Sequence, residues 1–301
     1  MPTITLNSVT MSYGKLTSLE NIDATIDEGS IFGLIGSNGS GKSTLLRTMC
    51  GVIKPQSGEV LFDNEPVYEN EKVKQSIVYL PDEQYFLPHS SINDMRTMLK
   101  TVRNSFSDKT FNKLRDVFKL DCDKKIDSFS KGMKKQASVM LGLASEPYCL
   151  LCDETFDGLD PVVRQLVKRV LAEESAEKRM TSVIASHNLR EIEDICDTVG
   201  LIHKGKLLFV RGIDDMKLGL RKVQAVFPEN FCVEWLNPLK ISSYERRGSL
   251  VTFIAHGSEQ ETDTVIRSLS PTFFETIPLT LEEIFITEME EMGYEFGKLI
   301  D

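Results

Sequence analysis

The spacing of hydrophobic and polar residues changes along the chain and predicts strands first, then strands that alternate with helices. In the first thirty residues hydrophobic side chains recur at every second position, as at Ile22, Ala24 and Ile26, which is typical of half-buried strands. Short apolar runs predict the later strands, at 31–35, 59–62, 77–80, 149–152, 181–185 and 199–202. Strands that alternate with helices form mainly parallel sheets, so we expect an α/β fold.

Two segments depart from this alternation. Residues 91–120 have a helical, polar-rich pattern and predict a separate lobe inserted between strands of the sheet. After Gly212 the pattern predicts a small α+β appendage with one helix near 260–269 and short strands at 223–227, 231–235 and 250–254. We therefore expect two domains, residues 1–213 and residues 214–301.

The appendage ends in a further predicted helix. Thr280 and Glu283 have the spacing of a capping box, which predicts that the helix begins just after Thr280. Glu288 interrupts an otherwise apolar stripe on this helix, formed by Leu281, Ile284, Phe285, Met289 and Met292. We expect the stripe to pack on its own domain, with a partner-binding face as the alternative.

Composition and charge narrow the classes of protein to which the chain can belong. Apolar residues make up 41% of the sequence, and no run approaches the about 18–20 apolar residues of a membrane span. The net charge is −10, of which residues 261–301 contribute −8 through ten acidic and two basic side chains. No basic stripe is present, so we expect no nucleic-acid partner. The first residues do not have the pattern of a signal peptide, so we expect a cytoplasmic protein.

Cys149 and Cys152 have the spacing of a redox or zinc pair. They lie, however, in an apolar run that predicts a buried strand, where residues three positions apart point to opposite faces. No second pair of Cys or His at zinc spacing lies nearby in the sequence. We expect buried, reduced thiols.

Residues 36–43 read Gly-Ser-Asn-Gly-Ser-Gly-Lys-Ser and match the phosphate-binding pattern G-x-x-x-x-G-K-[ST]. An apolar strand precedes the segment and a helix follows it, so backbone amides and the helix N-terminus would face an anion. Lys42 is placed to contact the β- and γ-phosphates and Ser43 to bind Mg²⁺. A glycine-rich surface turn is the alternative. The expected nucleotide-binding residues are Gly36, Ser37, Asn38, Gly39, Ser40, Gly41, Lys42, Ser43 and Thr44.

An acidic pair, Asp153 and Glu154, ends a buried strand downstream of this loop. In a fold with a phosphate loop this is the place of the second phosphate-side element. We expect Asp153 to hold Mg²⁺ and Glu154 to act as the general base for the attacking water. An acidic turn after a strand is the alternative reading of the pair.

A second anion site is predicted at Ser130 and Gly132, which precede a helix expected over 134–144. A single ATP molecule does not need two such sites in one subunit. In a dimer, the second site of each subunit can close on the γ-phosphate of the ATP that is bound to the other subunit. His187 follows a predicted strand, and we expect it at the γ-phosphate, although a lone histidine there is more often a surface residue.

The order of these elements resembles the ATP-binding subunit of ABC transporters across residues 1–213. The matching segments are residues 36–43 (Walker A), 129–133 (LSGGQ signature), 153–154 (Walker B and catalytic glutamate), 158–160 (D-loop) and His187 (switch histidine). The resemblance implies a P-loop NTPase (RecA-like) α/β core with an antiparallel β-subdomain and a helical subdomain. It also implies ATP and Mg²⁺ as the cofactors.

The resemblance implies roles for two further residues. Tyr13 matches the aromatic residue that stacks on adenine, and Asp160 matches the D-loop aspartate at the nucleotide. Asp160 has a second reading from the sequence alone, because Asp160-Pro161 supplies an N-cap and a first-turn proline for a helix. Both readings can hold together.

Several positions depart from the family pattern. Asp82 stands where the family usually has glutamine, so we assign it to Mg²⁺, with Gln84 as the rival. Lys131 and Met133 replace a glycine and a glutamine of the signature, and Thr155 replaces a common proline. Such signatures resemble the branch that serves ABC-2-type exporters.

The expected function is that of an ATP-hydrolysing subunit that powers transport, in the direction of export, through a separate integral membrane permease. We expect a homodimer, or a heterodimer with a paralogous ATPase subunit, on the inner face of the membrane, with the segment 85–89 pushing on the permease. The alternative is a soluble ABC-type ATPase that acts on a macromolecular complex. A small-molecule kinase is disfavoured, because it would share the phosphate loop but would not need both the signature segment and His187.

Overall fold

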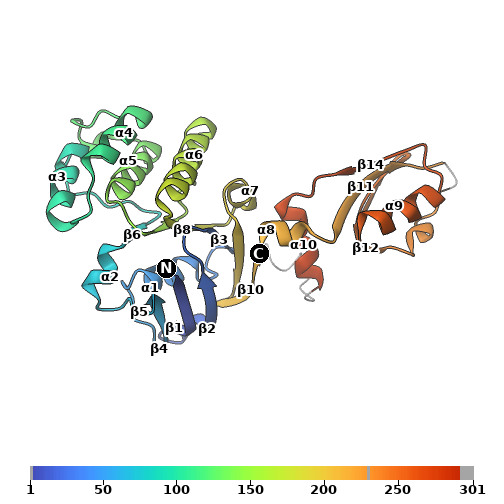
Figure 1. Cartoon of the computed structure of the whole chain (residues 1–301), viewed down its shortest axis with the longest axis horizontal. Coiled ribbons are helices and arrows are strands. Elements are labelled where there is room, and N and C mark those ends of the chain that lie inside the picture. The colour runs from blue at the N-terminus through green and yellow to red at the C-terminus, as the bar shows by residue number, and fades with distance from the viewer. Residues whose placement is uncertain (1–2, 229–230, 292–301) are drawn as a thin grey trace. The chain divides into compact units, whose positions relative to one another are not determined.

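The computed structural model describes residues 3–228 and 231–291, and the chain forms two compact units (Figure 1). The first unit contains residues 1–210 and the second contains residues 211–301. The boundary expected after residue 213 stays a prediction.

A six-stranded sheet forms the centre of the first unit, in the order β10-β9-β3-β8-β7-β6. Its strands are β3 (Ile31–Ile35), β6 (Ile77–Leu80), β7 (Cys149–Asp153), β8 (Thr181–Ser186), β9 (Thr198–His203) and β10 (Lys206–Gly212). The strands from β9 to β6 pair in parallel, with Leu34 opposite Ala185 and Cys152 opposite Ile184. Parallel pairing brings the carboxyl ends of β3, β7 and β8 to one edge, where the predicted site residues follow them.

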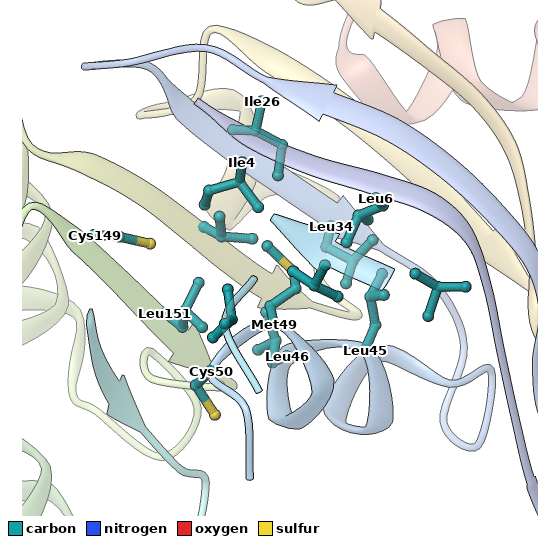
Figure 2. Close-up of a cluster of buried hydrophobic side chains, with 14 of the residues drawn as sticks. Ile4, Leu6, Ile26, Leu34, Leu45, Leu46, Met49, Cys50, Cys149 and Leu151 are labelled. Carbon is teal, nitrogen blue, oxygen red and sulfur yellow. The ribbon is translucent and has the colours of Figure 1, made fainter. Parts of the chain in front are cut away.

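A second, antiparallel sheet has the order β2-β1-β4-β5 and confirms the expected antiparallel β-subdomain. Its strands are β1 (Ile4–Tyr13), β2 (Leu16–Ile26), β4 (Ser57–Phe62) and β5 (Glu65–Pro66). Figure 2 shows helix α1 (Lys42–Met49) packing Leu45, Leu46 and Met49 among side chains of both sheets. These neighbours include Ile4 and Leu34. This shared core fixes the helix that begins at Lys42.

Helices gather in a lobe at the upper left of Figure 1. The lobe contains α3 (Ile92–Val102), α4 (Asp108–Phe118), the 3₁₀ turn Ile126–Ser128 and α5 (Lys131–Ala144), followed in the chain by α6 (Pro161–Lys178). Short helices α2 (Glu71–Gln75) and α7 (Leu189–Glu193) lie elsewhere in the unit. The helical subdomain expected at 91–120 is therefore confirmed, and α5 packs on α3 and α4.

The second unit is an antiparallel sheet, β12-β13-β11-β14, with helices. Its elements are α8 (Ile213–Lys217), β11 (Leu220–Val226), the 3₁₀ turn Val233–Leu236, β12 (Lys240–Arg247), β13 (Leu250–His256), α9 (Glu259–Ser268), β14 (Phe273–Ile277) and α10 (Leu281–Glu291). Apolar side chains of β11, β13 and α9 form its core, including Val223, Phe253 and Ile266. The α+β character expected of this part of the chain is present.

The strand predicted at 231–235 is wrong. The backbone N–H of Phe231 donates to Pro228 O at 2.9 Å, and a 3₁₀ turn follows at Val233–Leu236. Phe231 stacks on Phe227 with ring centroids 4.0 Å apart, so it fills the core from outside the strands of the sheet. Strands β12 and β14 were not predicted, because most of their side chains are exposed or half-buried and carry little alternation.

The predicted capping box of the last helix is confirmed. Thr280 N–H donates to the Glu283 carboxylate at 3.0 Å, and Glu283 N–H donates to the Thr280 hydroxyl at 3.2 Å. Glu288, which interrupts the apolar stripe, pairs with Arg211 at 2.6 Å within the same unit. The stripe members Leu281, Ile284 and Met289 are buried and Phe285 is half-buried, while Met292 lies outside the described residues.

Across residues 3–228 and 231–291 no helix has both the length and the apolar character needed to cross a membrane.

Candidate nucleotide-binding and catalytic site

The phosphate loop joins β3 to α1, and its shape depends on two glycines. Gly41 has φ 113°, and a Cβ on it would lie 2.6 Å from Ser18 O. A Cβ on Gly36 would lie 2.4 Å from Ile202 O. Both gaps are too short for a side chain, so the loop keeps its curvature only with glycine at these positions. The first N–H groups of α1 have no partner within the helix, so an anion is favoured at this helix end.

Lys42 is the first residue of α1, and its side chain is only 6% exposed. Its Nζ donates to Gly36 O at 2.7 Å and to Ser37 O at 3.2 Å, and lies 3.3 Å from Oε1 of Glu154. The ammonium group is therefore held inside the loop, between the backbone and a carboxylate. A phosphate group that binds in the loop would lie next to the positive charge of Lys42.

Asp153 ends β7 and is 1% exposed. Its Oδ2 accepts a hydrogen bond from the Tyr79 hydroxyl at 2.9 Å, and its buried Oδ1 has no hydrogen-bond partner. Burial, together with the Asp153 carboxylate, raises the pKa of Tyr79, so the hydroxyl stays protonated and keeps donating. A buried carboxylate oxygen without a partner fits a hard cation such as Mg²⁺, which takes one or two carboxylates together with substrate phosphates and water.

Ser43 lies beside Lys42 in the first turn of α1, where its hydroxyl would supply a further oxygen ligand. Among the described residues, no cluster of three or more His, Cys, Asp or Glu side chains could hold a metal by itself. The residues present thus fit a cation that is shared with a phosphate ligand, rather than one enclosed by protein side chains.

Glu154 follows Asp153 with φ 46°, in the left-handed region that residues other than glycine rarely adopt. Its Oε1 faces Lys42 and its Oε2 lies 2.9 Å from Nδ1 of His187. The structure therefore brings together Glu154 and His187, the two residues that the sequence predicted as catalytic. A carboxylate held between two cationic or hydrogen-bonding groups is oriented for proton transfer.

Asp82 and Gln84 follow strand β6. Oδ1 of Asp82 lies 3.1 Å from Nζ of Lys135, and the Gln84 amide donates to Pro81 O and Asp82 O, each at 2.8 Å. The Asp82 carboxylate thus has a lysine partner, and its assignment to Mg²⁺ stays a prediction.

Lys135 could not be singled out from the sequence. It lies between Lys134 and Gln136 in a polar stretch of the helix, and only the aspartate at position 82 was unexpected. Only the fold shows that the two side chains meet.

The signature segment departs from expectation in one respect. Helix α5 begins at Lys131 instead of Lys134, because Ser130 is its N-cap and accepts a hydrogen bond from Met133 N–H at 3.2 Å. Ser130 is exposed and Gly132 is half-buried. Lys131 pairs with Asp157 at 3.0 Å. The contact of Ser130 and Gly132 with a nucleotide on a second subunit stays a prediction.

Asp160 caps α6, as predicted, by accepting hydrogen bonds from Val162 N–H and Val163 N–H at 3.1 Å and 3.0 Å. Tyr13 ends β1 and is half-exposed. The role of Asp160 in the D-loop and the stacking of Tyr13 on adenine stay predictions.

Cys149 and Cys152 are free and fully buried, in agreement with the sequence analysis. Burial raises the pKa of Cys149 and raises the pKa of Cys152 to about 12. Both thiols are therefore protonated at neutral pH and unsuited to redox or metal chemistry.

Comparisons with known proteins agree with this geometry. Residues 19–157 match the family described as ABC transporter. The chain is 32% identical over 270 residues to the ABC transporter ATP-binding protein YtrB of Bacillus subtilis (strain 168), covering 90% of this chain and 92% of that protein. It is 29% identical over 222 residues to the bacitracin transport ATP-binding protein BcrA of Bacillus licheniformis, covering 73% of this chain and 72% of that protein.

Solved structures share the fold. An ATP-binding subunit of an ABC transporter superposes with a TM-score of 0.65 at 23% identity, covering 71% of this chain and 91% of that one. A dimeric ATP-binding cassette in a post-hydrolysis state, bound to ADP and Pi, superposes with a TM-score of 0.63 at 20% identity, covering 70% of this chain and 98% of that one. The chain therefore belongs to the ABC transporter family, as an ATP-binding subunit that hydrolyses ATP.

Proposed function

We propose that this subunit hydrolyses ATP with Glu154 as the general base and thereby drives export through a separate integral membrane permease. The observation that carries the proposal is the position of the Glu154 carboxylate, 3.3 Å from Lys42 and 2.9 Å from His187. In this position it lies beside the phosphate loop, where a water attacking the γ-phosphate would have to be deprotonated.

The residues around Glu154 would bind the phosphates, hold Mg²⁺ and orient the two carboxylates. Lys42 exchanges its contacts with loop carbonyls and Glu154 for phosphate oxygens, which frees the carboxylate to orient water. Asp153 and Ser43 would hold Mg²⁺, which supplies charge stabilisation on the phosphates. Tyr79 fixes the orientation of Asp153. His187 holds Glu154 through Nδ1, and with a proton on each ring nitrogen it would also donate to a phosphate oxygen through Nε2.

The second part of the proposal is a dimer of two cassettes, identical or paralogous. Ser130 is exposed at the N-terminus of a fourteen-residue helix, so its hydroxyl and the adjacent Gly132 are open to a partner's nucleotide. Two phosphate loops facing two such termini would enclose two ATP molecules. The dimer would close when ATP binds and reopen after hydrolysis, and this movement would drive the permease.

The third part is the contact with the permease. Strand β6, the loop after it and helices α3 and α5 line a cavity of about 190 Å³ that includes Tyr85, Phe86 and Leu99. Tyr85 is 78% exposed, so its aromatic ring is open to a partner. A hollow lined by both apolar and polar side chains, with an exposed tyrosine at it, fits a short amphipathic helix of the permease that faces the cytoplasm. Such a contact would place this subunit on the inner face of the membrane.

Export and the ABC-2 branch are the finer points of the proposal. The relatives support them through names that refer to bacitracin transport and, for SrtF of Streptococcus pyogenes, to lantibiotic transport. The signature residues Lys131 and Met133 point to the same branch.

The test is co-purification of the tagged full-length chain from detergent-solubilised membranes of its native host. An integral membrane protein should be recovered with the wild type and lost with Tyr85→Glu, while Tyr148→Glu, at another exposed tyrosine, should retain it. Recovery with ribosomes or another soluble complex, and never with a membrane protein, would favour the alternative of a soluble ABC-type ATPase.

A further inference from the structure

Lys135 is a buried lysine in the middle of α5, and its side chain has no exposed surface. A buried ammonium group is costly unless it is paired and hydrogen-bonded. Its Nζ has two acceptors, from two segments that are far apart in the sequence. One is Oδ1 of Asp82 at 3.1 Å, and the other is the backbone carbonyl oxygen of Glu154 at 2.5 Å.

The second acceptor matters because of the backbone of Glu154. With φ 46°, this residue holds a conformation that the surrounding structure has to impose. Its N–H donates to Ala185 O at 3.0 Å, and its carbonyl accepts from Lys135. The peptide groups on both sides of the Glu154 Cα are thus anchored, one by strand β8 and the other by helix α5.

Asp82 completes the arrangement from the loop after β6. Its carboxylate is nearly half-exposed, whereas the lysine that it pairs with is fully enclosed. The carboxylate supplies the negative charge that makes an ammonium group tolerable at this depth. The pair also ties the Asp82 loop to the segment that carries Glu154.

We propose that Lys135 is a positioning residue for ATP hydrolysis: it holds the Glu154 backbone so that the carboxylate is aimed at the reacting water, and Asp82 is its counter-charge. The inference rests on the proposed role of Glu154 as general base. Lys135 itself touches neither Lys42 nor His187 in the described contacts, so it acts through Glu154.

The first test compares Lys135→Met with Lys109→Met, the same change at an exposed lysine of α4. In the full-length chain with Mg²⁺, Lys135→Met should lower kcat at least about tenfold, because a misaimed base loses most of its contribution. The dissociation constant of a fluorescent ATP analogue should stay within about threefold of wild type, because the phosphate loop is unchanged. Lys109→Met should match the wild type in both.

Asp82→Ala serves as the second variant in case Lys135→Met does not fold, since position 82 is half-exposed. It should lower kcat several-fold with nucleotide affinity retained, and its thermal midpoint should fall, because Lys135 stays buried without its counter-charge. If kcat of both Lys135→Met and Asp82→Ala stays within about twofold of Lys109→Met, the inference is wrong.

A double-mutant cycle separates the inference from the role of Glu154. In single-turnover reactions, adding Lys135→Met to Glu154→Gln should slow the residual hydrolysis no more than about twofold, because the group it positions is already gone. If the fold-losses in hydrolysis rate of Lys135→Met and Glu154→Gln multiply in the double variant, the inference is wrong. If Glu154→Gln hydrolyses ATP at the wild-type rate, the role of Glu154 as general base is refuted. If Glu154→Gln is inactive while Lys135→Met is fully active, only the positioning role of Lys135 is refuted.

Discussion

Nδ1 of His187 lies 2.9 Å from Oε2 of Glu154, while the other carboxylate oxygen faces Lys42 at 3.3 Å. The three side chains come from the first residue of α1, the residue after β7 and the residue after β8. They meet because parallel strands end at one edge of the sheet. Both oxygens of the carboxylate therefore have a partner, and both partners lie at the phosphate loop or at the same edge of the sheet.

Glu154→Gln should bind ATP as the wild type does and lose turnover by about 10²- to 10⁴-fold, because the amide keeps the shape but cannot accept the proton. Phosphate release and equilibrium nucleotide binding measure the two effects. Glu173→Gln, at a half-exposed position of α6, is the matched control. Unchanged turnover in Glu154→Gln would remove this residue as the base.

Tyr79→Phe removes the hydroxyl that donates to Asp153, so a buried carboxylate would have neither oxygen hydrogen-bonded. The expected cost is about 1–3 kcal/mol in the free energy of unfolding, measured by chemical denaturation. The Mg²⁺ concentration for half-maximal ATPase activity should also rise. Tyr148→Phe, at an exposed tyrosine, should change neither quantity. An unaltered Mg²⁺ requirement in Tyr79→Phe would argue against the proposed support of Asp153.

The phosphate loop and the acidic pair could be predicted from sequence, because each is a local pattern that lies next to a strand of the sheet. The pair formed by Lys135 and Asp82 could not. The two residues are separated by most of the helical lobe, and neither has a pattern that reveals the partner. The start of α5 was misplaced for a local reason, since Ser130 was assigned to an anion while its hydroxyl also caps the helix.

The appendage was harder to predict, and its physical character explains the difference. Strands β11 and β13 are central and were both expected, because each has a run of alternating buried positions, Val223 and Ala225 in β11 and Val251, Phe253 and Ala255 in β13. Strands β12 and β14 lie at the edges of the sheet, where polar side chains are tolerated and the alternation disappears. The apolar residues at 231–235 suggested a strand, but Phe231 packs in the core from outside the sheet and Trp235 is exposed.

Glu174 of α6 should make stability depend on pH. Burial raises the pKa of this carboxyl, but hydrogen bonds from Lys178 and Lys113 outweigh it and leave the pKa below its ordinary value. The folded protein therefore keeps Glu174 ionised at a pH where the unfolded chain already binds the proton. Its contribution is complete above the ordinary carboxyl pKa and is lost as the pH falls through the lowered value.

Glu174→Gln tests this sign. The substitution should lower the free energy of unfolding by about 1–3 kcal/mol at pH 7, because two lysines lose a charged partner. The difference from wild type should shrink as the pH falls below the ordinary carboxyl range. Glu177→Gln, an exposed neighbour on the same helix, should have little effect at either pH. If the difference in the free energy of unfolding between Glu174→Gln and wild type grows as the pH falls, the lowered pKa of Glu174 is contradicted.

Asp160 offers a test that separates capping from communication between subunits. Its side chain accepts from two backbone N–H groups at the start of α6, and asparagine caps helices about as well as aspartate. Asp160→Ala should therefore lower the free energy of unfolding by about 1 kcal/mol, while Asp160→Asn should retain it. If the carboxylate also acts at the nucleotide of a dimer, Asp160→Asn should hydrolyse ATP several-fold more slowly than wild type at equal stability. Wild-type hydrolysis by Asp160→Asn would leave capping as the whole role of the residue.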